Sequence, residues 1–300
     1  MGNGIFPGTH SGQYSIRAEL VMTQGSGSLP PLNIPAILRQ AEIKPSRGLG
    51  QNFLSDDRIL EKIVSLSEVT GNDEVLEIGP GLGSLTRHLV QSARSVTAVE
   101  IDKKIIPVLS EILNGYANVN LVCGDILVQD IGKLGLKPNY LVVANIPYYI
   151  TSAVIRHLLE GQIKPARIVL TVQLEVAQRI CAKPGDLNLL ALSVQVYGKP
   201  QVIMRIPAGA FYPPPKIDSA VVRIDLFPEP FIPTSKLDRF FLLCKAGFGQ
   251  KRKTLRNSLS HGLGITTKLV EEKLAAAEID PGRRAETLSL QEWKTVVGVW

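Results

Sequence analysis

The feature that most constrains the fold is a regular alternation of short β-branched runs with helix-length amphipathic segments, which starts at Asp73. The runs expected to form strands cover Glu74–Ile78, Ser95–Glu100, Val119–Cys123, Tyr140–Ala144 and Arg167–Val172. The segments with apolar residues at helical spacing cover Leu85–Ala93, Lys103–Leu113 and Ser152–Leu159. Strands that alternate with helices are typical of βαβ units around a parallel sheet. We therefore predict an α/β protein with a Rossmann-like, mostly parallel sheet.

The pattern changes after the fifth strand. A Pro-rich loop, and no helix, joins the runs Gln201–Ile206 and Ala220–Leu226, which predicts an antiparallel hairpin at the sheet edge. Three prolines then interrupt the chain between Pro228 and Pro233, and helical periodicity continues to the end. The expected helices there cover Leu237–Cys244, Lys253–Leu259, Thr267–Ala277 and Leu290–Val297. We predict a larger α/β domain over residues 46–230 and a small all-helical domain over residues 231–300.

Residues 1–45 are rich in Gly, Ser and Pro and predict a flexible N-terminal extension, in which Met22 is the expected true start. No apolar run approaches the roughly 18 residues that span a bilayer, so we expect a cytoplasmic protein without membrane contact. The three cysteines are far apart, with no Cys/His cluster, and encode neither a zinc site nor a disulfide framework. We expect no metal.

A glycine-rich loop follows the first predicted strand and opens a helix. It reads Glu77-Ile78-Gly79-Pro80-Gly81-Leu82-Gly83-Ser84, with Ser84 where a dinucleotide fingerprint has its third glycine. An acidic residue at its head suits a ligand with a cationic group better than a pyrophosphate. The loop therefore favours S-adenosylmethionine over NAD, although a merely structural turn would also explain the glycines.

Acidic residues also end the next two predicted strands. Glu100 comes 21 positions after Gly79, close to the interval of about 20 residues at which an acid reaches a nucleoside ribose. Asp125 follows the third strand, where its carboxylate can accept from an adenine amino group. Because open α/β sheets bind ligands along this edge, successive polar strand ends predict one nucleoside-binding site.

The decisive element is Asn145-Ile146-Pro147-Tyr148-Tyr149, directly after the fourth strand. An exocyclic base amine is a weak nucleophile, and acceptors aimed at its two hydrogens favour the pyramidal geometry it needs to attack a methyl sulfonium. The Asn145 side-chain oxygen and the Ile146 carbonyl are the natural pair, and Tyr148 offers a face for a flipped base. No catalytic base is required, and His88, His157 and His261 are expected on helix faces or in a turn.

The chain from Ser46 onward resembles the small-subunit ribosomal RNA adenine N6-dimethyltransferases, the kasugamycin-resistance enzymes. The resemblance rests on five motifs: Gly50-Gln51-Asn52-Phe53-Leu54, Glu77 to Gly81, Asn145 to Tyr148, Phe211 to Ala220 and Phe248 to Lys253. It implies a class I S-adenosylmethionine-dependent methyltransferase sheet followed by a small helical domain. The N-terminal extension departs from the family, and Tyr149 stands where many members have Asn.

The resemblance also implies the site residues and the substrate. The implied methyl-donor contacts are Asn52, Leu54, Gly79, Glu100, Asp125 and Asn145, and Asn145, Tyr148 and Phe211 are implied to hold the target adenine, with Phe211 opposite Tyr148. The family dimethylates two adjacent adenines in a hairpin loop near the 3′ end of 16S rRNA, within the precursor small ribosomal subunit. We expect a monomer with a role in small-subunit biogenesis.

Charge is concentrated towards the C-terminus. The formal net charge is +6, and residues 236–300 hold twelve Lys and Arg against seven Asp and Glu. The residues predicted to bind rRNA phosphates are Lys245, Lys251, Arg252, Lys253 and Arg256. A solvated helical surface is the alternative explanation of these charges.

Three other functions remain open. A large-subunit rRNA adenine methyltransferase of the antibiotic-resistance type shares the fold and the motif at Asn145, but the segments 211–220 and 248–253 argue against it. A ribosome-assembly RNA-binding factor without chemistry would tolerate damage at Asn145 or Glu100, and both are intact. A nicotinamide oxidoreductase is disfavoured by the missing third glycine.

Overall fold

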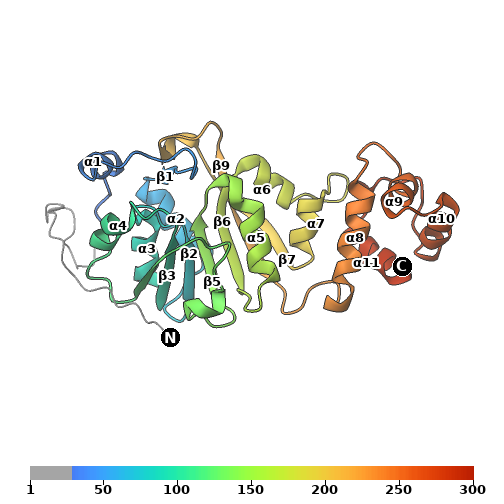
Figure 1. Cartoon of the computed structure of the whole chain (residues 1–300), viewed down its shortest axis with the longest axis horizontal. Helices are drawn as coiled ribbons and strands as arrows, with labels where there is room; N and C mark the ends of the chain where they lie inside the picture. Colours follow the sequence, from blue (N-terminus) through green and yellow to red (C-terminus); the bar gives the residue numbers. More distant parts are fainter. Residues whose placement is uncertain (1–28) are drawn as a thin grey trace.

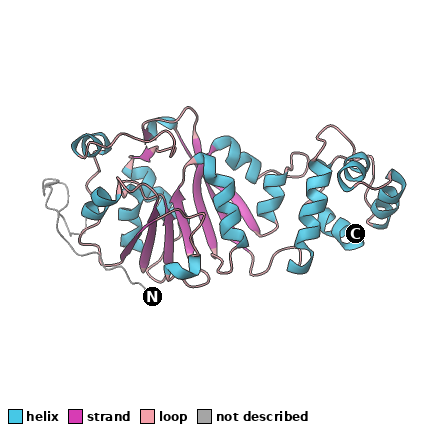
Figure 2. Cartoon of the chain, viewed as in Figure 1, coloured by secondary structure: helices cyan, strands magenta, loops and turns pink. Residues whose placement is uncertain are grey.

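The computed structural model describes residues 29–300, and its centre is a seven-stranded sheet with the order β4-β3-β2-β5-β6-β9-β7 (Figures 1 and 2). The strands are β2 (Glu74–Ile78), β3 (Ser95–Glu100), β4 (Val119–Cys123), β5 (Leu141–Asn145), β6 (Arg167–Gln173), β7 (Gly198–Ile206) and β9 (Ser219–Leu226). The first five are mutually parallel, and β9 is antiparallel to both β6 and β7. The predicted mostly parallel sheet with an antiparallel edge hairpin is confirmed.

Alternate residues of the central strands enter two different cores, one on each face of the sheet. Val75 and Val143 pack with α2 (Asp57–Ser67) and α3 (Ser84–Ser92). Leu76 and Val142 point to the other face, which α5 (Thr151–Glu160), α6 (Leu174–Ile180) and α7 (Leu189–Gln195) cover. Burial on both faces explains why these strands are continuous apolar runs, with no polar alternation.

One sequence expectation is wrong within residues 29–45. The helix α1 (Ile34–Gln40) lies in the segment predicted to be flexible, and the side-chain oxygen of Asn33 caps it by accepting from the Ala36 N–H at 3.1 Å. Its buried residues Ile34, Ile37 and Leu38 share a core with Leu82 of the glycine loop and with α4 (Ile106–Ile112). Seven residues are too few to give a clear periodic pattern, which is why the sequence did not predict this helix. A helix this short is unstable in isolation, and burial of its apolar residues stabilises it. The predicted start at Met22 lies outside the described residues.

A second, two-stranded sheet brings two distant segments together. In it β1 (Phe53–Leu54) pairs antiparallel with β8 (Phe211–Tyr212), so that Leu54 lies opposite Phe211. The Ser55 N–H extends this pairing by donating to the Ala210 carbonyl at 3.1 Å. The chain that precedes α2 is thereby held against the Pro-rich loop between β7 and β9.

The last part of the chain forms four α-helices: α8 (Leu237–Phe248), α9 (Leu255–Leu263), α10 (Thr267–Ala276) and α11 (Leu290–Val299). The side chain of Ser289 accepts from the Glu292 N–H and the Glu292 carboxylate accepts from the Ser289 N–H, which caps α11 reciprocally. None of the helices within residues 29–300 is long and apolar enough to cross a bilayer.

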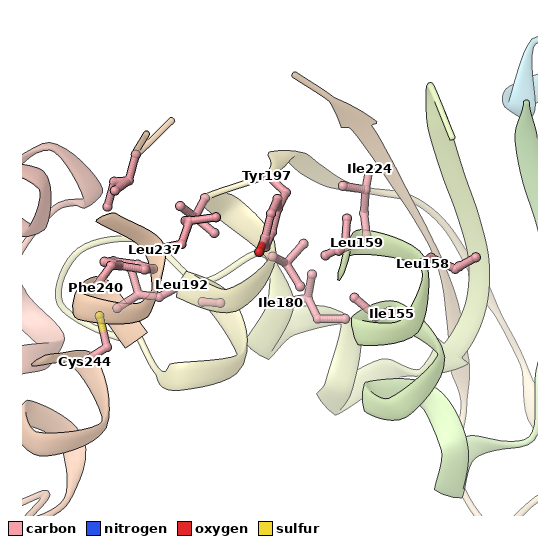
Figure 3. Close-up of a cluster of buried hydrophobic side chains, with 14 of the residues drawn as sticks. Ile155, Leu158, Leu159, Ile180, Leu192, Tyr197, Ile224, Leu237, Phe240 and Cys244 are labelled. Carbon is pink, nitrogen blue, oxygen red and sulfur yellow. The ribbon is translucent and has the colours of Figure 1, made fainter. Parts of the chain in front are cut away.

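The helices at the C-terminus share one apolar core with the sheet. Leu237, Phe240 and Cys244 of α8 belong to the same buried cluster as Leu192 of α7 and Ile224 of β9. Figure 3 shows a row of buried side chains that runs from those of α8 and α7 through Tyr197 and Ile180 to Ile224. This continuity positions the helical part relative to the sheet. The division between residues 230 and 231 stays a prediction.

Candidate active site

A cavity of about 210 Å³ opens at the carboxyl ends of the parallel strands. Its wall combines the segment 49–54, the glycine loop after β2, the end of β3, the loop after β4 and the residues 145–150 that follow β5. The predicted site residues in this wall are Asn52, Leu54, Gly79, Glu100, Asp125, Asn145 and Tyr148. Parallel strands bring all their carboxyl ends to one edge, which is why residues so distant in sequence meet here.

The glycine loop is shaped by close packing. Gly81 and Gly83 have φ angles of 58° and 79°, in the left-handed region that L side chains rarely adopt. A Cβ on Gly81 would lie 3.0 Å from the Phe53 ring, and one on Gly83 would lie 2.9 Å from Leu109 Cδ1. Glycine at these positions lets β1 and α4 approach the loop, and α3 begins directly after it.

Glu100 at the end of β3 fastens the glycine loop. Its Oε2 accepts from the Gly81 N–H at 3.0 Å, and its Oε1 accepts from the Asp102 N–H at 2.8 Å. Burial raises the pKa of Glu100, and these backbone donors oppose that rise because they favour the carboxylate. After β4, the Asp125 carboxylate accepts from the Leu127 N–H at 2.9 Å. Both acids therefore line the cavity with their side chains held in place by backbone donors.

Glu77 at the end of β2 carries an unsatisfied buried carboxyl oxygen. The residue is 1% exposed, and neither its Oε2 nor the nearby Thr86 hydroxyl has a well-formed hydrogen bond within residues 29–300. Burial raises the pKa of the Glu77 carboxyl group to about 8, and the proximity of the Thr86 hydroxyl only partly opposes that rise. The part of the cavity wall that the structure describes holds three carboxyl groups, those of Glu77, Glu100 and Asp125, and no Lys, Arg or His. A cationic ligand would lower the free energy of such a site, whereas a pyrophosphate would raise it.

Asn145, the last residue of β5, has its amide orientation set by the opposite wall. Its Nδ2 donates to the Asn52 carbonyl at 3.2 Å, which leaves Oδ1 as the available acceptor. The segment before β1 is itself fastened, because the Ser46 N–H donates to Gln51 Oε1 at 2.7 Å and Gln51 Nε2 donates to Asp102 Oδ2 at 2.8 Å. Sequence patterns assigned no role to Gln51 and Asp102, although Gln51 lies within a motif that carried the resemblance.

Tyr148 follows in a short 3₁₀ turn (Tyr148–Ile150) and is anchored to the sheet. Its hydroxyl shares a hydrogen bond with the Ser219 hydroxyl of β9 at 2.6 Å. Burial raises the pKa of the Tyr148 phenol, and the bond to Ser219 partly offsets this. Sequence reasoning missed Ser219 as a partner, because only the tertiary structure brings β9 beside this turn.

Phe211 does not lie where the resemblance implies. Its side chain is 3% exposed and packs in the core with Ile206, Val221 and Leu54, and the ring is not part of the cavity wall. A ring so enclosed presents no open face to a nucleobase. Through its pairing with Leu54 in the β1–β8 sheet, Phe211 instead supports the wall on which the donor contacts depend.

The predicted phosphate contacts fall into two groups. Lys245 at the end of α8 and the residues 251–253 in the loop before α9 are exposed and form no ion pair among the described residues. Arg256 differs, because its Nη1 lies 2.6 Å from Glu271 Oε1, so a phosphate would have to displace that carboxylate. In Figure 1, the α8–α9 loop lies on the same upper side of the molecule as β1.

His88, His157 and His261 stand apart from the cavity, as expected. His88 of α3 lies 3.2 Å from Asp57 Oδ1, and His157 of α5 lies 3.1 Å from the Gln129 carbonyl. His261 is exposed on α9. Within residues 29–300, no group of three or more His, Cys, Asp or Glu side chains is arranged to hold a metal ion.

Several known sequences match this chain over most of its length. A family model described as ribosomal RNA adenine dimethylase matches residues 43–298. The ribosomal RNA small subunit methyltransferase A of Dehalococcoides mccartyi strain CBDB1 is 47% identical over 270 residues, which cover 87% of this chain and 92% of the relative. The protein of the same name from Alkaliphilus oremlandii is 42% identical over 270 residues and covers 88% and 94%.

Two solved structures share the fold over most of the chain. A dimethyladenosine transferase from Plasmodium falciparum matches with a TM-score of 0.71 at 25% identity, over 81% of this chain and 95% of that one. The 23S rRNA methyltransferase ErmE matches with a TM-score of 0.68 at 28% identity, over 83% and 99%.

Proposed function

Because the chain belongs to the ribosomal RNA adenine dimethylase family, we propose that it dimethylates the N6 amines of two adjacent adenines in the 3′-terminal hairpin loop of 16S rRNA. S-adenosylmethionine is the proposed methyl donor, and the precursor small ribosomal subunit is the proposed substrate particle. The observation that carries this proposal is the Asn145 amide, whose available oxygen lies at a cavity with three carboxyl groups and no basic side chain among the described residues.

The cavity wall fits the proposed donor. We assign Glu100 to the ribose hydroxyls and Asp125 to the adenine amino group, and further donor contacts to Asn52, Leu54, Gly79 and Asn145, all of which line the cavity. S-adenosylmethionine, when bound, supplies an electrophilic methyl group on a sulfonium. The unpartnered Oε2 of Glu77 can meet the positive charge of such a ligand when the carboxyl group loses its proton, whereas the pyrophosphate of NAD would find three carboxyl groups and no basic side chain in the described wall.

The chain's own groups prepare the target base. Asn145 Oδ1 and the Ile146 carbonyl accept the two N6 hydrogens, which favours a pyramidal nitrogen with its lone pair available. Tyr148, fixed through Ser219, offers a ring against which a flipped adenine stacks. The proton that leaves after methylation passes to water, so no basic side chain is needed. Phe211 acts by supporting Leu54 rather than by stacking.

RNA binding is assigned to the exposed cations of the helical part. The loop between α8 and α9, which carries the basic residues 251–253, lies on the same upper side of Figure 1 as β1, and Lys245 is exposed in the last turn of α8. Phosphate contacts from this surface would hold a hairpin while its loop base enters the cavity, because loop adenines are flipped at lower cost than paired ones. We propose that the protein acts as a monomer in the cytoplasm, during assembly of the small subunit.

A large-subunit rRNA methyltransferase is the second candidate, and the likeness to ErmE favours it. The relatives at 42–47% identity carry the small-subunit name, whereas ErmE is 28% identical. The higher identity therefore favours small-subunit rRNA as the substrate. Family membership and the acidic cavity argue against a nicotinamide oxidoreductase. A ribosome-assembly factor without methyl transfer is opposed by the intact Asn145 and Glu100.

Methylation of two substrates tests the proposal. Small subunits from cells that lack this protein, and protein-free large-subunit rRNA, are each incubated with the enzyme and labelled S-adenosylmethionine. We expect N6,N6-dimethyladenosine in the 3′-terminal hairpin of small-subunit rRNA by mass spectrometry, and none with Asn145→Ala. Label in large-subunit rRNA alone would establish the second candidate, and equal product from Asn145→Ala would contradict the assigned chemistry.

A further inference from the structure

An exposed aromatic ring stands at the rim of the active-site cavity. Tyr149 is 64% exposed, more than any other aromatic residue within residues 29–300, and it forms part of the cavity wall. Its neighbour Tyr148 also lines the cavity, but the Tyr148 hydroxyl is bonded to the Ser219 hydroxyl of β9. Exposing a large aromatic surface to water is unfavourable, and such rings commonly mark binding sites.

The Tyr149 ring rests on a rigid support. A Cβ on Gly50 would lie 3.3 Å from Tyr149 Cδ1 and Cε1, so the ring packs closely against the Gly50 backbone. The φ angle of Gly50 is 60°, and its N–H donates to the Arg47 carbonyl at 3.1 Å to close the turn. The hydrogen bond from Gln51 to Asp102 fastens this turn to the end of β3. The ring is therefore held in place on one side and open on the other.

The turn that supports the Tyr149 ring also carries an arginine. Arg47 begins the turn that ends at Gly50, and it is exposed and forms no ion pair among the described residues. An exposed aromatic ring supported by a turn that carries an exposed arginine matches a nucleotide, because a ring can stack on any base and a guanidinium can bind phosphate. A second feature of RNA methylation supports this occupant: when a base flips out, its neighbour in the loop is deprived of a stacking partner.

We propose that Tyr149 and Arg47 form a second nucleotide subsite, which holds the nucleotide adjacent to the target adenine. Tyr149 stacks on the base of that nucleotide, and Arg47 binds its phosphate. The subsite rests on the proposed function. When the target base enters the cavity, the neighbouring base loses it as a stacking partner, and the Tyr149 ring takes its place. Tyr149 would thereby contribute to affinity for the RNA and not to affinity for the methyl donor.

Steady-state methylation of small subunits tests the subsite. Tyr149→Leu keeps an apolar side chain but removes the ring, and we expect KM for the particle to rise about tenfold, the effect of removing one ring that stacks on a base. Tyr149→Phe and Tyr149→Trp keep a ring and are expected to restore the wild-type KM. The dissociation constant of S-adenosylmethionine, measured by calorimetry, is expected to stay within about twofold of wild type in all three variants.

Arg47→Ala tests the phosphate contact. We expect the slope of log affinity against log salt to decrease by about one, and Lys133→Ala, at an exposed position in the turn Ile131–Leu134, to leave it unchanged. The proposal is overturned if Tyr149→Leu binds the particle as wild type does, or if Phe and Trp fail to restore KM. If wild-type protein methylates no rRNA, the proposed function itself fails, and that result is separate from a failure of the subsite.

Discussion

The side-chain amide of Asn145 donates from Nδ2 to the carbonyl of Asn52 at 3.2 Å, across 93 positions of sequence. This bond decides which end of the amide is available for chemistry. Because Nδ2 is turned toward the Asn52 carbonyl, Oδ1 lies at the other end of the amide, where we propose that it accepts from the target amine. The segment before β1 therefore orients the Asn145 amide, although it lies far from β5 in the chain.

Replacing Asn145 should abolish methyl transfer without unfolding the protein. We expect Asn145→Ala to lower kcat by about 10²–10³-fold, the usual cost of removing one group that stabilises a transition state. Transfer of labelled methyl groups to small subunits measures the effect. Asn114→Ala, at an exposed asparagine after α4, provides the control and should keep wild-type activity. A kcat for Asn145→Ala within about twofold of wild type would contradict the assigned role.

Glu77 should make the protein without bound donor less stable as the pH rises. Its pKa is about 8 in the folded chain against an ordinary value of 4.5. Between these values the unfolded chain releases a proton that the folded chain keeps, so the free energy of unfolding falls as pH increases. Its contribution is fully present below pH 4.5 and disappears as pH rises through about 8. Urea unfolding at several pH values across this interval measures the trend, and Glu77→Gln should flatten it.

Binding of the donor should release a proton from Glu77. A cation next to this carboxyl group favours its ionised form, which lowers its pKa. Titration calorimetry at neutral pH in two buffers of different ionisation enthalpy reports the number of protons released. We expect a fraction of a proton close to one for wild type and a value near zero for Glu77→Gln. Equal proton release by both proteins would show that another group titrates.

The helix α1 should contribute to stability in spite of its short length. Ile37 is buried against α4 and the glycine loop, so Ile37→Ala should lower the free energy of unfolding by about 2–5 kcal/mol. Arg39→Ala, on the exposed side of the same helix, should change it by less than about 0.5 kcal/mol. Chemical unfolding of both variants checks the difference. Indistinguishable curves would mean that α1 is not docked in solution.

The exposed basic loop should bind RNA through charge. We expect Lys251→Ala combined with Arg252→Ala to weaken binding to small subunits and to flatten its salt dependence by about two units of slope, one for each phosphate that is no longer neutralised. Arg256→Ala should have a smaller effect, because Arg256 is paired with Glu271. Affinity measured at several salt concentrations distinguishes the variants. An unchanged slope in the double variant would identify the loop as solvated surface.

The positions of the strands along the chain and the acidic residues of the cavity could be predicted because each has a local signal. Five strands and the edge hairpin follow from β-branched runs, and burial on both faces makes the apolar runs of β5 and β6 nearly continuous. Gly79, Glu100, Asp125 and Asn145 follow from their places at strand ends, since parallel strands deliver their carboxyl ends to one edge. The observed sheet and cavity wall agree with these placements.

Short-range periodicity and motifs were enough to predict the sheet, the polar residues at the strand ends and the family. Each of these depends on residues that lie close together in the sequence. Four features became visible only in the folded chain: α1 is docked, Phe211 is enclosed, Arg256 is paired with Glu271, and Gly50 supports Tyr149. Each of them depends on the approach of segments distant in sequence or on side-chain packing, and burial or pairing of this kind leaves no pattern in the local sequence.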